Sequence, residues 1–236
     1  MNIIGSLQEK TLHAQLKQYY CEAGGETEVL VAGYIVDVLN DGQIVEIQTG
    51  SFSAIKTKLN RLLENYSVRL VYPLTGERWL LTSGIKEEDG VNRRKSPKKE
   101  NLYEIFGELV SFPSLIHNDR FMLEVAVISE ELVRQRAKRR TRRNHGWKFL
   151  DRRLVKVLAT HVFSDAADFD IFLPETLPEA FTTRDLADLA KISRSLSQKS
   201  IYCLREMGRI KLIGSRQRFN LYTRCEAGNS ITHIEE

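Results

Sequence analysis

The chain has 236 residues, of which 42% are hydrophobic and 28% are charged, and this is the composition of a globular protein with a buried core. No apolar run reaches the roughly 18 residues that a membrane helix needs, and the first residues lack the pattern of a signal peptide. Three widely spaced cysteines form no CxxC pair, which argues against a zinc site and a disulfide framework. We therefore expect a cytoplasmic protein without a membrane segment.

The net charge of +4 is unevenly distributed along the chain. Residues 1–130 hold 14 Lys and Arg against 18 Asp and Glu, whereas residues 131–236 hold 21 against 13. An acidic first part and a basic second part predict that the second part faces nucleic acid.

The first half of the sequence predicts a small α/β domain. Residues 6–20 predict a helix, because Ser6 and Glu9 match a capping box and the leucines approximate a helical stripe. Asn40-Asp41-Gly42 is a strong hairpin signal between two runs that are rich in Val and Ile. The other predicted elements are strands over 28–39 and 43–49, a helix over 52–64, and strands over 68–74, 78–83 and 121–129.

Two charged segments interrupt this order. Residues 84–100 are poor in apolar side chains, which is typical of a loop. Residues 134–143, RQRAKRRTRR, carry seven basic side chains and no acid. Such a block is either a solvated linker or a segment that contacts the DNA backbone. We expect Trp147 and Phe149, which follow it, to be packing anchors of the next domain.

The last part of the sequence predicts a winged helix-turn-helix. Residues 151–163 look helical, and helices over 182–191 and 193–207 each begin at a Thr or Ser cap. Gly208 ends the last helix, and two short strands then flank Ser215-Arg216-Gln217. Two helices joined by a short turn and followed by a β-ribbon are the parts of that motif.

The hairpin is where the sequence is most informative. A two-residue turn at Asp41-Gly42 places Asp37 opposite Glu46 on one side of the sheet, and Gln48 lies on that side too. Two opposed carboxylates repel each other, and a bound cation would compensate this repulsion. Mg²⁺ is the natural candidate, because it binds carboxylates together with waters and phosphate oxygens. In the alternative interpretation, Asp37 precedes the turn and Glu46 is an exposed strand residue.

Asp37 and the Glu46-Ile47-Gln48 sequence, with a helix before and a helix after, resemble the PD-(D/E)xK nuclease superfamily of restriction endonucleases and junction resolvases. The wider string is similar to a bacterial family of uncharacterised proteins with an ExQ variant of the motif. The resemblance implies an α/β, restriction-endonuclease-like core with a central mixed sheet and flanking helices. It also implies phosphodiester hydrolysis with Mg²⁺ or Mn²⁺ and, because many such nucleases dimerise, a homodimer.

The resemblance also implies roles for individual residues. Asp37 and Glu46 would hold the metal, and Glu9 would match the glutamate found on the first helix of resolvase-like members, with Glu28 or Glu26 as substitutes. The superfamily usually has Lys where this chain has Gln48. The attacking water would then be positioned by Gln48 or by a lysine of the following helix, where Lys56 is preferred over Lys58. His13, four residues after Glu9, either lines this site or is an ordinary helix histidine.

Basic and polar residues gather where a winged helix meets DNA. Residues 184–224 contain ten Lys and Arg and three acids. The predicted DNA contacts at the second helix, the ribbon tip and the basic block are Arg194, Ser195, Gln198, Lys199, Arg216, Arg218, Arg139, Arg140, Arg142 and Arg143. The alternative is a winged helix that contacts protein or caps the first domain.

The sequence as a whole predicts a nuclease-like domain over 1–130, a basic linker over 131–150, a winged helix over 151–225 and a tail over 226–236. The favoured function is a metal-dependent DNA endonuclease that acts on double-stranded or branched DNA. The first alternative is a catalytically inactive DNA-binding protein or transcriptional regulator on the same scaffold. The second is a member that acts on RNA or binds a protein partner.

Overall fold

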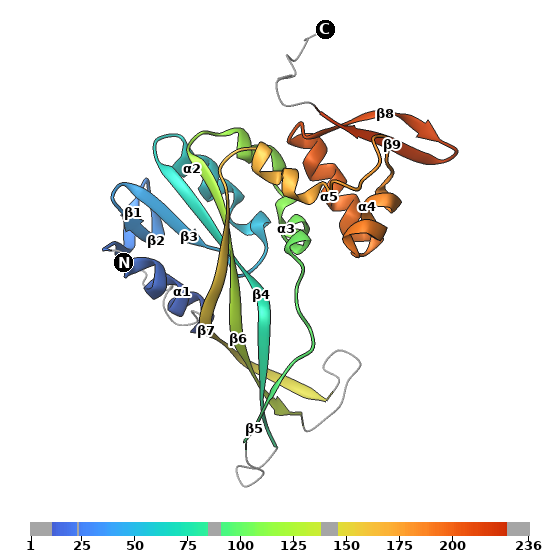
Figure 1. Cartoon of the computed structure of the whole chain (residues 1–236). Helices are drawn as coiled ribbons and strands as arrows, with labels where there is room; N and C mark the ends of the chain where they lie inside the picture. Colours follow the sequence, from blue (N-terminus) through green and yellow to red (C-terminus); the bar gives the residue numbers. More distant parts are fainter. Residues whose placement is uncertain (1–10, 23, 85–90, 138–145, 226–236) are drawn as a thin grey trace. The chain divides into compact units, whose positions relative to one another are not determined.

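Figure 1 shows the computed structural model of the chain, which describes residues 11–22, 24–84, 91–137 and 146–225. The chain divides into two units. The first comprises Met1–Thr49, Val71–Glu100 and Val125–His161, and the second comprises Gly50–Leu70, Asn101–Glu124 and Val162–Glu236. The α-helices are α1 (Thr11–Cys21), α2 (Lys56–Leu63), α3 (Phe106–Leu109), α4 (Thr183–Ala190) and α5 (Arg194–Glu206), and the 3₁₀ helices are η1 (Phe52–Ala54), η3 (Leu102–Ile105), η4 (Pro113–His117) and η5 (Ala167–Phe172).

The fold is mixed α/β, as predicted, with a large mixed sheet and flanking helices. Seven strands form this sheet in the order β1-β2-β3-β4-β6-β7, and β5 pairs with β4. Their bounds are β1 (Glu26–Val31), β2 (Tyr34–Asn40), β3 (Gln43–Ile47), β4 (Ser67–Ser83), β5 (Val91–Lys95), β6 (Phe121–Arg136) and β7 (Trp147–Phe163). A separate ribbon consists of β8 (Ile210–Arg216) and β9 (Phe219–Arg224). No helix in the described ranges is long and apolar enough to cross a membrane.

The predicted strand over 28–39 is wrong, because a tight turn divides this stretch into β1 and β2. The two strands are antiparallel, with Val31 paired to Tyr34. Ala32 has φ 49° and Gly33 has φ 84°, which are the left-handed values of a two-residue hairpin turn. The turn could not be predicted from the sequence, because alanine seldom adopts a positive φ.

The predicted helix over 151–163 and the predicted linker over 131–150 are also wrong. Residues 151–163 belong to β7, which begins at Trp147, and the start of the basic block extends β6 to Arg136. The predicted loop over 84–100 likewise contains β5. The ends of β6 and β7 are joined by a bond from the Ala137 N–H to the Gly146 carbonyl at 2.9 Å. The basic block therefore begins on a strand of the large sheet.

The core of the first unit lies between α1 and the hairpin strands. Leu12 and Leu16 on α1 pack with Val38, Val45 and Ile47, and all five are buried. Figure 1 shows α1 lying against β1 to β3. Two side chains of α1 also contact β7: Gln15 accepts the Leu154 N–H at 2.7 Å, and Thr11 donates to Asp151 at 3.0 Å. This packing fixes α1 beside the strands that carry Asp37 and Glu46.

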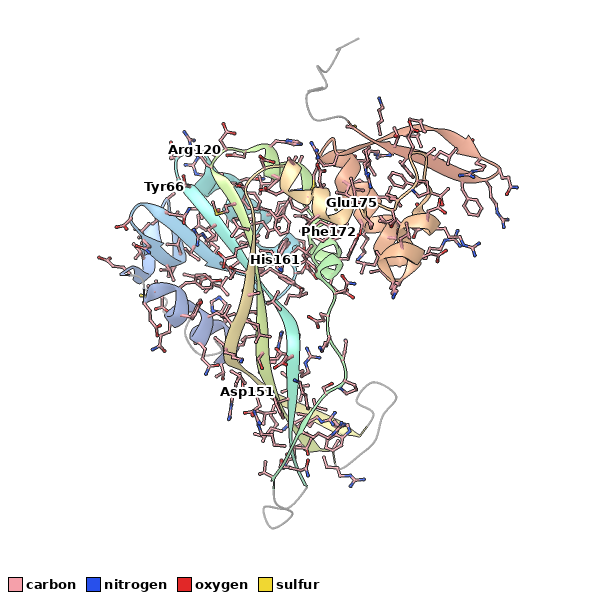
Figure 2. The ribbon with its side chains drawn as sticks, viewed as in Figure 1. Tyr66, Arg120, Asp151, His161, Phe172 and Glu175 are labelled. Carbon is pink, nitrogen blue, oxygen red and sulfur yellow. The ribbon has the colours of Figure 1, made fainter. Side chains whose placement is uncertain are left out.

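The core of the second unit is aromatic. Phe106 and Phe172 approach edge to face at 4.7 Å between ring centroids, and Phe163 lies 4.5 Å from Phe169. The Tyr103 hydroxyl donates to the Phe172 carbonyl at 2.8 Å, and burial raises the pKa of Tyr103 to about 12. Figure 2 labels Phe172 in this unit. Aromatic burial of this kind supplies much of the stabilisation of a small core.

Candidate metal centre and nucleic-acid interface

The hairpin of β2 and β3 has the register that the sequence predicts. Asp41 has φ 46° and Gly42 has φ 80°, so these two residues form the turn. Asn40 pairs with Gln43, Leu39 with Ile44 and Val38 with Val45. The register of these pairs continues to Asp37 and Glu46, which lie on neighbouring strands.

Asp37 links three elements through one carboxylate oxygen. Its Oδ2 accepts the Ile47 N–H at 2.8 Å, just beyond the last backbone pair of the hairpin. The Nε2 atom of His13, on α1, lies 3.2 Å from the same oxygen. The side chain of Asp37 is 19% exposed, so it lies at the edge of the core rather than inside it. His13 therefore lines the candidate site.

Glu46 is a buried carboxylate in the middle of β3. It is 2% exposed, and Ile44, Val45 and Ile47 beside it are buried as well. This burial contradicts the alternative interpretation of Glu46 as an exposed strand residue. An ionised carboxylate costs much free energy in such surroundings unless hydrogen bonds or a cation compensate its charge.

The other predicted site residues lie in different settings. Gln48 follows β3, is partly buried, and donates its backbone N–H to the Val71 carbonyl at 2.9 Å. Lys56 is exposed at the first position of α2, in the second unit. Glu28 pairs with Lys17 at 2.9 Å. Glu9 lies outside the described residues. In the part of the chain that the structure describes, His, Cys, Asp and Glu form no group of three that could hold a metal.

The comparisons with known proteins place the chain in a family. Residues 10–164 match the family described as "Domain of unknown function (DUF8091)", a region that includes the hairpin and the whole large sheet. The chain belongs to this family. A relative from Treponema pallidum (strain Nichols), described as an uncharacterized protein, is 31% identical over 187 residues, which are 78% of this chain and 73% of the relative. No solved structure matches the chain.

The helices α4 and α5 follow the matched family region and are fixed by local caps. Thr182 forms a capping box with Asp185, and the Ser193 hydroxyl accepts the Leu196 N–H at 3.2 Å. Lys191 ends α4 in the left-handed conformation with φ 53°. The Ser197 hydroxyl, inside α5, donates to the Thr183 carbonyl at 2.6 Å and ties the two helices together. These caps confirm the predicted boundaries of both helices.

A groove of about 420 Å³ lies between α5 and the ribbon. Arg194 and Arg218 approach the Phe219 ring from α5 and from the ribbon turn, with guanidinium carbons at 5.5 Å and 5.7 Å from its centroid. Positive charge and an aromatic ring therefore share one concave surface. The residues that line the groove are Thr183, Arg194, Gln198, Ile201, Tyr202, Arg205, Arg218, Phe219, Asn220 and Tyr222.

The groove gathers only some of the predicted DNA contacts. Arg194, Gln198 and Arg218 line it. Ser195 and Arg216 are exposed but are not among its lining residues, and Lys199 reaches the Gly107 carbonyl at 3.5 Å. The basic residues Arg139, Arg140, Arg142 and Arg143 lie outside the described residues.

Sequence reasoning missed Tyr202, Arg205 and Phe219, which also line the groove. A signal for two of them was present. Arg194, Gln198, Tyr202 and Arg205 recur at spacings of four, four and three residues, which places them on one face of a helix. The position of Phe219 depends on the ribbon, and the sequence does not specify how a ribbon packs against a helix.

Proposed function

We propose that the chain is a metal-dependent DNA endonuclease in which Asp37 and Glu46 hold Mg²⁺ and a C-terminal winged helix binds duplex DNA. The observation that carries this proposal is the register of the β2–β3 hairpin, which, continued by one residue, pairs Asp37 with Glu46 on neighbouring strands.

The donor set fits Mg²⁺. This ion is commonly held by one or two carboxylates and completes its shell with waters and substrate phosphates, so a third protein ligand is not required. Asp37 and Glu46 would hold it. When bound, the metal lowers the pKa of a coordinated water and stabilises negative charge on a phosphodiester.

The remaining residues would orient the reacting groups. The Ile47 N–H and the His13 imidazole fix the position of Asp37 Oδ2 and so the orientation of the carboxylate that would hold the metal. The Gln48 amide would orient the attacking water without abstracting its proton, since an amide is not a base at neutral pH. The role of Lys56 rests on the family resemblance alone.

The DNA-binding part of the proposal rests on the groove between α5 and the ribbon. A helix, a turn, a second helix and a two-stranded ribbon occur in the order of a winged helix-turn-helix. Phe181, just before α4, forms an isolated antiparallel bridge with Tyr222 of the ribbon. Arg194, Arg205 and Arg218 would neutralise phosphates of the backbone, and Gln198 would face base edges.

A second candidate function is DNA binding without cleavage. It is favoured by the 2% exposure of Glu46, by the absence of a three-residue metal cluster within the described ranges, and by Gln48 in place of the usual lysine. Both candidates share the winged helix. They differ only in whether the carboxylate pair acts on a phosphodiester.

A cleavage assay separates the two. The purified chain would be incubated with plasmid, linear and branched DNA in Mg²⁺, in Mn²⁺ and in EDTA, beside Asp37→Ala, Glu46→Ala and the control Asp41→Asn. We expect metal-dependent cutting that both alanine variants lose and the control retains, with DNA affinity unchanged in all three. DNA binding without cutting in any metal would contradict the endonuclease and leave the second candidate.

A further inference from the structure

The strand β5 presents its charges on two different faces. It pairs with β4 in the register Trp79–Lys95, Leu80–Arg94 and Leu81–Arg93, and all its residues are exposed. Because side chains alternate along a strand, Arg93 and Lys95 lie on one face and Arg94 lies on the other. Figure 1 shows β5 beside the end of β4.

The face of Arg93 and Lys95 is electrically balanced. Arg93 bonds to Glu131 at 2.7 Å, and Lys95 bonds to Glu77 at 2.6 Å. Both cations also lie over the Trp79 ring, at 4.0 Å and 5.7 Å from its centroid. The hydrogen bond from Lys95 lowers the pKa of Glu77, so this carboxylate stays ionised as the partner of the lysine. This face needs no further anion.

The opposite face carries Arg94 and Arg134, which have no carboxylate partner among the described residues. The guanidinium of Arg134 on β6 lies over the Trp147 ring at 4.1 Å, and its Nε is buried without a hydrogen-bond acceptor among the described residues. Burial first and the nearby charge of Arg94 second lower the pKa of Arg134. Within the described ranges, neither Arg94 nor Arg134 has an ion-pair partner. Two guanidinium groups that repel each other are stabilised by an anion between them.

The same face extends along β6 and β7. Arg136 lies two residues beyond Arg134 on β6 and is exposed. Phe149 lies two residues beyond Trp147 on β7 and is 53% exposed, which contradicts the prediction that it is a packing anchor. We define Arg94, Arg134, Arg136, Trp147 and Phe149 as the arm face. Its chemistry is that of nucleic-acid surfaces, in which arginines alternate with aromatic rings.

We propose that the arm face is a second DNA-binding site, at which Arg94 and Arg134 bind phosphodiester groups of the backbone. The inference rests on the proposed DNA-directed function and adds a contact in the first unit to the groove in the second. A guanidinium fork matches the geometry of a phosphate, and stacking on Trp147 holds the Arg134 fork in place before binding.

Trp147 provides a local reporter, because the chain has two tryptophans and the other is Trp79. The full-length Trp79→Phe protein would be titrated in EDTA with a DNA duplex of about 20 base pairs, while Trp147 emission and the anisotropy of labelled DNA are followed. We expect a saturable change in emission. Arg94→Gln with Arg134→Gln should abolish this change, weaken binding roughly tenfold, and make the slope of log K against log salt less negative by about 1.8, or 0.9 for each phosphate contact.

The matched control is Arg93→Gln with Lys95→Gln, which removes the same charge from the other face of β5. Circular dichroism and thermal unfolding of each variant verify that it is folded. The proposed site at the arm face would be contradicted if the two double variants had equal effects. It would also be contradicted if Arg94→Gln with Arg134→Gln changed neither the Trp147 emission nor the DNA anisotropy. A response to polyglutamate or RNA, but not to DNA, would overturn it as well.

A groove variant distinguishes this inference from the proposed function. In Arg194→Ala with Arg218→Ala, the Trp147 response should persist at higher DNA concentration. If that variant loses all DNA binding while Arg94→Gln with Arg134→Gln changes neither affinity nor Trp147 emission, the proposal for the arm face is wrong and DNA binding by the winged helix is supported. If the unmodified chain binds no DNA, both fail. If it binds DNA and the Trp147 response occurs without cutting in any metal, the arm face stands and the endonuclease fails.

Discussion

Asp37 has a structural role that does not depend on the proposed reaction. Its Oδ2 accepts the Ile47 N–H where the backbone pairing of the hairpin ends, and His13 contacts the same oxygen. The carboxylate thus holds β2, β3 and α1 in place whether or not a metal is bound. A structural role and a catalytic role can be separated only by variants that keep the acceptor and remove the charge.

Asparagine and alanine at position 37 make this separation. Asp37→Ala removes the acceptor of the Ile47 N–H and should lower the free energy of unfolding by about 1–3 kcal/mol. Asp37→Asn keeps an oxygen acceptor and should cost less than about 1 kcal/mol. Urea unfolding at pH 7 in EDTA measures both. Equal stability of the two variants would show that the bond to Ile47 does not contribute.

Asp168 makes a pH-dependent contribution. Its Oδ2 accepts the Ser164 N–H at 2.6 Å, the Ser164 hydroxyl at 3.1 Å and the Asp165 N–H at 3.1 Å. The backbone bond from Ser164 is the main reason why the pKa of Asp168 is lowered. A lowered pKa in the folded state stabilises the fold above the ordinary value near 4, and this stabilisation is lost as pH falls through the lowered value.

Asp168→Asn should therefore be less stable than the unmodified chain at pH 7, by at most about 1 kcal/mol because the site is near the surface. The difference should stay constant down to about pH 5 and shrink below it. Thermal unfolding of both proteins between pH 3 and 7 tests this, and a difference that does not change with pH would contradict it.

At the scale of elements, sequence reasoning works where local chemistry decides. The α4 and α5 boundaries are predictable because Thr182 and Ser193 cap them, and the β2–β3 register is predictable because Asp-Gly fixes the turn. The β7 strand was missed because Leu154, Val157 and Leu158 have helical spacing, and only pairing with β6 makes them a strand.

In the candidate site too, features set by local sequence could be predicted, and features set by tertiary packing could not. The Asp37–Glu46 pair follows from the turn, so the sequence predicts it. The contact between His13 and Asp37 depends on how α1 packs on the sheet, and the lining of the groove by Phe219 depends on how the ribbon meets α5. The arm face needs β5 and the ends of β6 and β7, which the sequence presents as charged loops.

Substitution of Gly25, the residue before β1, tests how closely the chain packs against the hairpin. A methyl group on Gly25 would lie 2.8 Å from Val38 Cγ1 and 2.9 Å from the Leu39 carbonyl oxygen, whereas a methyl group on Gly50 would have no neighbour within 4 Å. Gly25→Ala should lower the free energy of unfolding by about 1–3 kcal/mol, because backbone must move. Gly50→Ala is the control and should change it by less than about 0.5 kcal/mol. Similar urea midpoints would contradict this packing.

At the scale of the whole molecule, basic side chains of the described residues gather on two surfaces. One is the groove between α5 and the ribbon, and the other is the arm face on β5, β6 and β7. The proposed DNA contacts would release counterions, so they would give affinity that falls with salt and does not depend on base sequence.

The groove makes a quantitative prediction about salt. Arg194→Ala with Arg218→Ala should make the slope of log K against log salt less negative by about 1.8. The control Arg61→Ala with Arg184→Ala removes two exposed arginines that are paired with Glu64 and Asp188 and should leave the slope unchanged. Anisotropy of a labelled duplex over a salt series measures both slopes, and identical slopes would exclude the groove as a phosphate contact.

The most direct test of the carboxylate pair is metal binding itself. Free Mn²⁺ can be counted by electron paramagnetic resonance as it is titrated into the unmodified chain, into Asp37→Asn with Glu46→Gln, and into the control Asp41→Asn. We expect saturable Mn²⁺ binding by the unmodified chain and the control, competition by Mg²⁺, and at least tenfold weaker binding by the double variant. Equal binding by all three proteins, or no binding by any, would contradict a metal site at Asp37 and Glu46.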